Sequence, residues 1–94
     1  MAPLSDAEAD AALGHLAGWT RAGATIRKQF VFTGFPQAVE FISRLVPGAE
    51  AADHHPDVVI NYKRVTLTYT THSDGGLTAK DFAGAAMADR VSVA

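Results

Sequence analysis

The sequence contains no cysteine among its 94 residues. This absence excludes disulfides, thiolate metal ligands and thiol nucleophiles together, and it is typical of proteins from a reducing compartment. Any chemistry is therefore left to imidazole, carboxylate and hydroxyl groups. The N-terminal residues have neither the basic start nor the continuous apolar stretch of a signal peptide, so we expect a cytoplasmic protein.

Charged residues and long apolar runs are also scarce. Eight basic residues stand against ten acidic ones, for a net charge of −2, and the lysines and arginines are scattered along the chain. This distribution predicts no basic surface for a nucleic acid backbone. Because the sequence has no run of about 20 apolar residues, we also expect no membrane-spanning segment.

The remaining composition is that of a folded globular protein. Hydrophobic residues make up 48% of the chain and charged residues 19%, without an excess of proline or glycine. A chain of this length has room for one hydrophobic core, so we expect residues 1–94 to form a single domain.

Local patterns in the first part of the chain predict a helix followed by a hairpin. Ser5 and Glu8 have the spacing of a capping box, and the helix is expected to run to about Leu16. The segment from Trp19 alternates apolar and polar residues after a turn at 22–23, which indicates two strands.

The middle of the chain predicts a second helix. It begins near Pro36, a residue favoured in a first helical turn, and carries one apolar face of residues spaced three and four apart: Ala38, Phe41, Ile42 and Leu45. Pro47, followed by Gly48, is expected to break or kink this helix, because proline lacks a backbone donor and clashes with the preceding turn. The "AEAAD" stretch at 49–53 is compatible with a helix that resumes after the break.

The last third predicts a second hairpin and a third helix. The strands flank a tight turn at Tyr62 and Lys63, and Thr78 with Asp81 forms a second capping box for a helix ending near Val91. The expected fold class is α+β, with the order αββαββα and a four-stranded antiparallel sheet that carries three helices on one face.

Histidines concentrate in the second half of the sequence. His54 and His55 are adjacent at a helix end, and Glu50 lies four residues before His54, where a helix would place both on one face. In that position the carboxylate would orient the imidazole and favour its charged form, an arrangement suited to a general acid. The alternative is a helix C-terminus that carries histidines because they interact favourably with the helix dipole.

Other interpretations of these residues stay open at this stage. Three histidines also form known zinc sites, but adjacent histidines are poorly placed to chelate one ion, so we expect no metal site. Asp81 is explained by helix capping alone, Asp53 by solvation or a pairing with a neighbouring histidine, and Trp19 by burial in the core. His72, at a strand end, is expected to point outward.

The pattern E-x3-H-H-P-x5-Y-x9-H-x8-D, formed by Glu50, His54, His55, Pro56, Tyr62, His72 and Asp81, resembles the signature of the pterin-4a-carbinolamine dehydratases. The resemblance extends to Gly18 and Trp19 and to the "KQFVF" stretch at 28–32, so it covers nearly the whole chain. It implies a hydro-lyase that converts 4a-hydroxytetrahydropterin to quinonoid dihydropterin, in pterin cofactor recycling, without a metal or an organic cofactor.

The resemblance also implies roles for individual residues. His54 and His72 match the acid–base pair, and His55 matches a substrate-positioning group, so we expect the three rings to converge on one cleft. Glu50, Asp53, Asp81 and Trp19 are expected to bind the substrate or support its pocket.

Dehydratase-like folds also serve as binding partners, and these define the alternative function. Such relatives act as transcriptional dimerisation cofactors or as assembly factors for a carbon-fixing enzyme. The resemblance implies a homodimer or homotetramer, with a pterin as the small-molecule partner.

Overall fold

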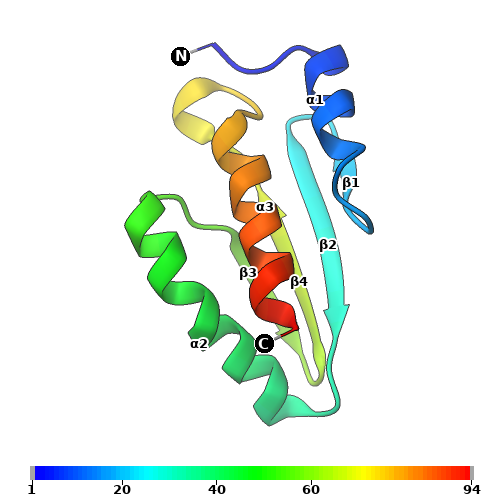
Figure 1. Ribbon diagram of the computed structural model, residues 1–94, viewed down its shortest axis with the longest axis vertical. Helices are drawn as coiled ribbons and strands as arrows, with labels where there is room; N and C mark the ends of the chain where they lie inside the picture. Colours follow the sequence, from blue (N-terminus) through cyan, green and yellow to red (C-terminus); the bar gives the residue numbers. More distant parts are fainter. Residues whose placement is uncertain (1, 94) are drawn as a thin grey trace.

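The computed structural model describes residues 2–93, and it contains three α-helices and one four-stranded sheet. Along the chain the elements are α1 (Asp6–Leu13), β1 (Thr20–Ala22), β2 (Thr25–Val31), α2 (Phe35–Ala52), β3 (Asp57–Asn61), β4 (Arg64–Tyr69), the short 3-10 helix η1 (His72–Asp74) and α3 (Ala79–Ser92). The predicted order αββαββα is confirmed, and the helices lie on one side of the sheet (Figure 1).

The sheet is antiparallel throughout, with the spatial order β1-β2-β4-β3. β4 is therefore central, and its alternate residues Val65, Leu67 and Tyr69 are fully buried under the helices. The turn to β4 occurs at Tyr62, whose φ of 56° is left-handed. The predicted tight turn at Tyr62 and Lys63 is thus confirmed, and it sets the register that directs Tyr69 inward.

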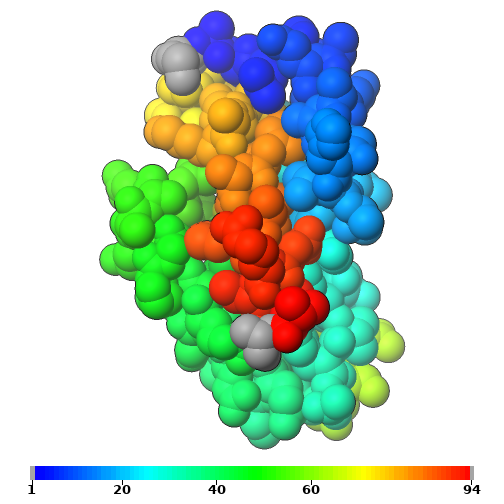
Figure 2. All heavy atoms as spheres, viewed as in Figure 1, coloured from blue at the N-terminus to red at the C-terminus, as the bar shows by residue number. Residues whose placement is uncertain are grey.

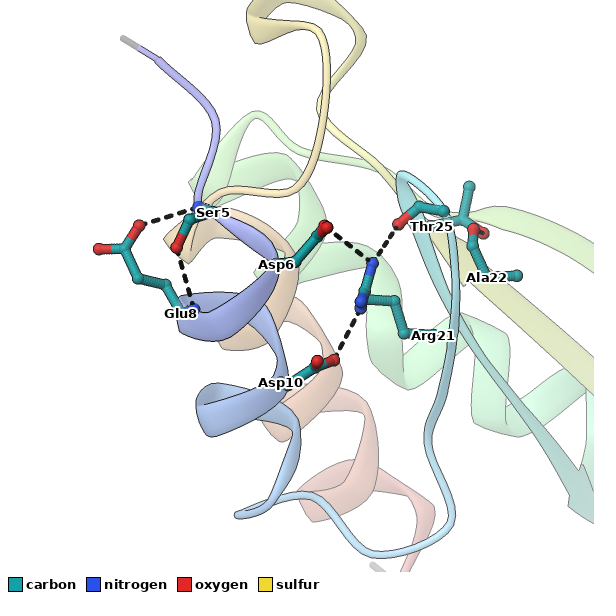
Figure 3. Close-up of polar contacts among 8 residues, drawn as sticks. Ser5, Asp6, Glu8, Asp10, Arg21, Ala22 and Thr25 are labelled. Atoms are coloured by element: carbon teal, nitrogen blue, oxygen red, sulfur yellow. Dashed lines mark hydrogen bonds and ion pairs between the residues drawn. The ribbon is translucent and has the colours of Figure 1, made fainter.

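Helix α1 is held to the first hairpin by capping and by ion pairs. Ser5 and Glu8 form the predicted capping box, while Arg21 of β1 contacts Asp10 at 2.9 Å and Asp6 at 3.3 Å (Figure 3). The helix ends at Leu13, one turn earlier than the predicted Leu16, and the backbone tightens there into turns.

Helix α2 runs without interruption through Pro47, which corrects the prediction of a break. Its buried face consists of Ala38, Phe41, Leu45 and Ala49. Burying a large apolar side chain contributes about 1.5 to 3 kcal/mol, so this face outweighs the local preference of one proline. Pro47 itself is exposed. Because proline has no N–H, the carbonyl group four residues earlier has no backbone partner, and at this exposed position water can bond to it.

Helices α2 and α3 approach each other closely at Gly48. A Cβ atom at this position would lie 1.9 Å from the sulfur of Met87, so only glycine fits beside that side chain as it stands. On the helix-covered face α3 lies between α2 and α1 (Figure 2). This contact brings the C-terminal end of α2 next to α3, where the candidate site is found.

Candidate active site

A buried carboxylate organises the site at the start of α3. Asp81 is completely buried, and its Oδ2 accepts from the backbone N–H of Thr78 at 2.9 Å and from the hydroxyl of Thr71 at 2.8 Å. The first of these bonds belongs to the predicted capping box, which is confirmed. Its Oδ1 lies 2.6 Å from Nε2 of His54.

This arrangement defines the chemistry available to His54. With Asp81 as the acceptor, Nε2 of the imidazole carries the hydrogen, and Nδ1 is left to exchange a proton with a bound molecule. The side chain of His54 is 12% exposed, so the ring is mostly enclosed but still accessible. A carboxylate-oriented histidine of this kind is suited to general acid–base catalysis.

The chain reverses direction between α2 and His54. Asp53 ends the helix with a left-handed φ of 49°, and the backbone N–H of His54 returns to the carbonyl of Ala49 at 3.1 Å. This turn carries His54 off the helix and toward α3. The expected pairing of Glu50 with His54 on one helical face is therefore wrong, since that expectation required the helix to continue.

Glu50 pairs instead with His55. Its Oε2 lies 2.5 Å from Nε2 of the ring, and both side chains are more than half exposed. With Pro56 and apolar residues of α2 and β3, the pair lines a cavity of about 170 Å³. An exposed pair contributes at most about 1 kcal/mol to stability. The contact with Glu50 therefore matters more for the orientation of the His55 ring than for folding.

His54 opens onto a different cavity, of about 280 Å³, between the end of α2 and α3. Its lining combines cationic and small or flexible side chains: Ala52, His54, Lys80, Ala83, Gly84, Met87 and Arg90. The two adjacent histidines thus face two separate hollows, and His72 lines neither of them, so the expected convergence of the three histidine rings on one cleft is wrong for the single chain.

His72 is nevertheless close to the Asp81 network along the backbone. It begins η1, directly after Thr71, whose hydroxyl bonds to Asp81. Its side chain is exposed, in agreement with the expected outward direction. Asp81 therefore connects His54 to the segment that carries His72.

Trp19 and Asp53 line neither of the two cavities beside the histidines. Trp19 is a core residue whose indole N–H donates to Asp89 at 3.1 and 3.2 Å, and its ring contacts Tyr69. Asp53 is exposed and shapes the turn through its backbone.

Sequence reasoning missed two residues that support the pair of His54 and Asp81. Thr71 binds Asp81, and Tyr69 stacks on the imidazole with ring centroids 6.0 Å apart. Burial first, and the charge of Asp81 second, raise the pKa of Tyr69 to about 12. The sequence held a signal for both residues. Positions 69 and 71 are two apart, so strand periodicity places Thr71 on the same inward face as Tyr69.

The part of the chain that the structure describes contains neither a group of metal ligands nor a membrane-spanning helix. No group of three or more His, Asp or Glu side chains there is arranged to hold a metal ion. None of the helices in residues 2–93 combines the length and apolar character needed to cross a bilayer.

Comparison with known proteins gives consistent results. The family model described as pterin 4 alpha carbinolamine dehydratase matches residues 2–91. A protein of Roseiflexus sp. (strain RS-1), provisionally named pterin-4-alpha-carbinolamine dehydratase, is 51% identical over 88 residues, covering 94% of this chain and 95% of the relative. A protein of Mycobacterium sp. (strain KMS) with the same provisional name is 43% identical over 91 residues, covering 97% of each chain.

Two solved structures share the fold. A transcriptional coactivator/pterin dehydratase from Brucella melitensis superposes with a TM-score of 0.92 at 33% identity, covering 96% of this chain and 98% of the other. A pterin dehydratase-like RuBisCO assembly factor of the alpha-carboxysome has a TM-score of 0.64 at 21% identity, covering 79% and 86%. The second similarity concerns the fold alone.

Proposed function

Since the chain belongs to the pterin-4-alpha-carbinolamine dehydratase family, we propose that it removes water from a 4a-hydroxytetrahydropterin to give the quinonoid dihydropterin. The observation that carries the proposal is the hydrogen bond between Nε2 of His54 and the buried carboxylate of Asp81. It orients an accessible imidazole at the edge of a cavity, as an acid–base group requires.

The reaction needs two proton transfers and no change of oxidation state. The bond between C4a and the hydroxyl oxygen breaks, the oxygen takes a proton and leaves as water, and N5 loses its proton as the C4a–N5 double bond forms. One proton enters and one leaves, so two groups that each cycle between neutral and charged forms suffice. Histidine does this near neutral pH.

We assign these transfers to His54 and His72. His54 is fixed by Asp81, and His72 follows Thr71, which is bonded to the other oxygen of the same carboxylate. His55, held by Glu50 at the exposed side of the turn, is assigned to substrate positioning.

Stopped-flow measurement of 4a-hydroxytetrahydropterin decay tests the assignment. His54→Ala and His72→Ala should each slow turnover by roughly 10²-fold, the scale of losing one positioned acid or base. His55→Ala should act mainly on KM, because binding lost equally from ground and transition states leaves kcat intact. The double variant should lose less than the product of the single losses, since both groups serve one reaction.

His15→Ala provides the matched control, because His15 is an exposed histidine just beyond α1 and should not affect the rate. Direct measurement of pterin binding separates lost chemistry from a folding defect. If the His54, His72 double variant dehydrates the substrate at the parent rate, the acid–base assignment is wrong. A non-catalytic binding or assembly role, of the kind named for two solved relatives, would then be favoured.

A further inference from the structure

Tyr69 packs against the imidazole of His54. It is fully buried on β4, and its ring lies directly against the backbone of α3 at Gly84. A Cβ atom at Gly84 would lie 2.6 Å from Cε1 of the tyrosine and 2.9 Å from Cζ. The ring therefore occupies space that exists only because residue 84 has no side chain.

The rings of Tyr69 and His54 are nearly parallel. Their centroids are 6.0 Å apart and their planes differ by 22°, within the range of offset stacking. Tyr69 also contacts the buried Trp19, at a centroid distance of 6.0 Å. The ring of Tyr69, held by Trp19 and by the backbone of α3 at Gly84, thus forms one wall against which the imidazole of His54 packs.

A wall of this kind adds a restraint on the plane of the imidazole to the orientation that the bond to Asp81 supplies. Nε2 lies nearer than Nδ1 to the axis of rotation about the Cβ–Cγ bond of histidine, so one hydrogen bond at Nε2 restrains that rotation only in part. Nδ1 lies farther from the axis and swings as the ring turns. Fixing the plane of the ring fixes the direction of Nδ1, the nitrogen that would exchange a proton with substrate.

We propose that the ring of Tyr69 is a positioning element that holds the plane of His54 and so aims its Nδ1. This inference rests on the proposed function for its catalytic consequence, but the positioning itself is a property of the folded chain. The role belongs to the ring, because the hydroxyl of Tyr69 is buried and has no hydrogen-bond partner in residues 2–93. The phenol stays neutral throughout the range in which histidine titrates, since its pKa is raised to about 12.

Two substitutions separate the ring from the hydroxyl. Tyr69→Phe keeps the wall and should leave kcat within about twofold of the parent. Tyr69→Leu removes the wall and should lower kcat by about 10-fold while KM changes little, because only the aim of an acid–base group is lost. Gly84→Ala, which forces the tyrosine ring to move, should resemble Tyr69→Leu although the tyrosine is retained.

A second readout does not depend on turnover. The ¹⁵N shifts of the His54 ring nitrogens, assigned by their absence in His54→Ala and recorded where the ring is neutral, report which nitrogen carries the hydrogen. The parent and Tyr69→Phe should show one tautomer protonated at Nε2. Tyr69→Leu and Gly84→Ala should show shifts averaged between the two tautomers, because an imidazole that turns freely loosens its Nε2 bond to Asp81. Phe30→Leu is the control, since Phe30 is a buried aromatic residue that packs on Trp19 and Phe41 instead of His54.

The outcomes separate the two proposals. Parent-like His54 shifts and parent-like kcat in both Tyr69→Leu and Gly84→Ala would overturn the positioning role. Equal losses in Tyr69→Phe and Tyr69→Leu would overturn it as well, because the hydroxyl would then be the active group. If Tyr69→Leu and Gly84→Ala show averaged His54 shifts but the parent protein does not dehydrate the substrate, the positioning role is supported and the proposed function is rejected.

Discussion

Asp81 combines a structural and a chemical contact in one side chain. Its Oδ2 closes the capping box of α3 and binds Thr71, while its Oδ1 binds His54. Capping and positioning therefore cannot be varied independently at this residue. The carboxylate orders the start of α3 and the imidazole together.

Asp81→Asn should affect both properties. An amide presents a donor where the carboxylate accepts, so one buried bond is lost, at a cost of about 1 to 3 kcal/mol in the free energy of unfolding. Turnover should also fall, because Nε2 of His54 loses its charged acceptor. Urea unfolding and the dehydration assay at matched folded fraction measure the two effects.

Glu50→Gln is the matched control for this substitution. It makes the same chemical change in the exposed pair with His55, and should cost less than about 1 kcal/mol. Unchanged turnover in Asp81→Asn would reduce the residue to a helix cap.

Tyr69 predicts a loss of stability at alkaline pH. Its pKa in the folded state is about 12, above the ordinary value of 10.0, so the folded protein keeps the phenol proton that the unfolded chain releases. Below pH 10 both states are protonated and the stability is fully present. As the pH rises from 10 toward 12 the stability falls, by roughly 2 to 3 kcal/mol for a shift of this size.

Comparison with Tyr69→Phe isolates this effect from other titrating groups. The difference in unfolding free energy between parent and variant should be constant up to about pH 9 and then change in favour of the variant. A difference that stays constant to pH 12 would show that the phenol ionises alike in both states.

At the scale of elements, α2 carries a local conflict at Pro47. The helix continues for five residues beyond the proline, from Gly48 to Ala52, and these residues lead to the turn that releases His54. The buried apolar face on both sides of Pro47 holds the helix in place. The site therefore depends on a helical segment that local propensity disfavours.

Pro47→Ala should stabilise the protein. Alanine restores the backbone donor and removes the clash, which is worth about 1 to 3 kcal/mol at an exposed helical position, less a contribution from the more flexible unfolded chain. Chemical denaturation measures the change. Pro36→Ala is the control, because proline is well accommodated in the first turn of α2 and its removal should bring no comparable gain. A loss of stability in Pro47→Ala would mean that the proline makes a favourable contribution in its present place.

At the scale of the whole molecule, the sheet ends in two outer strands, β1 and β3. β3 carries Val58 and Val59, which are 41% and 60% exposed. An outer strand with exposed apolar residues favours pairing with another chain.

We expect a homo-oligomer at micromolar concentration, and sedimentation velocity measures it. Val59→Lys should shift the distribution toward the monomer, because a charge on an outer strand opposes association. Thr25→Lys, on the inner strand β2, provides a comparison with the same added charge. A parent protein that sediments as a monomer at all concentrations tested would contradict the expectation.

The sequence by itself determined those features that depend on neighbouring residues. Both capping boxes, at Ser5 and Thr78, follow from hydrogen bonds over three residues. The inward direction of Tyr69 follows from the period of two along a strand. The family signature likewise located the histidines without any structure.

Only the tertiary structure decided which acid meets which histidine. Asp81 is 27 residues from His54, and their 2.6 Å contact exists because α2 and α3 pack side by side. Helical spacing would have joined Glu50 to His54, but the left-handed turn at Asp53 redirects the chain. Local rules describe the backbone over a few residues, whereas the burial of whole faces fixes which distant groups meet, and it kept α2 helical through Pro47 for the same reason.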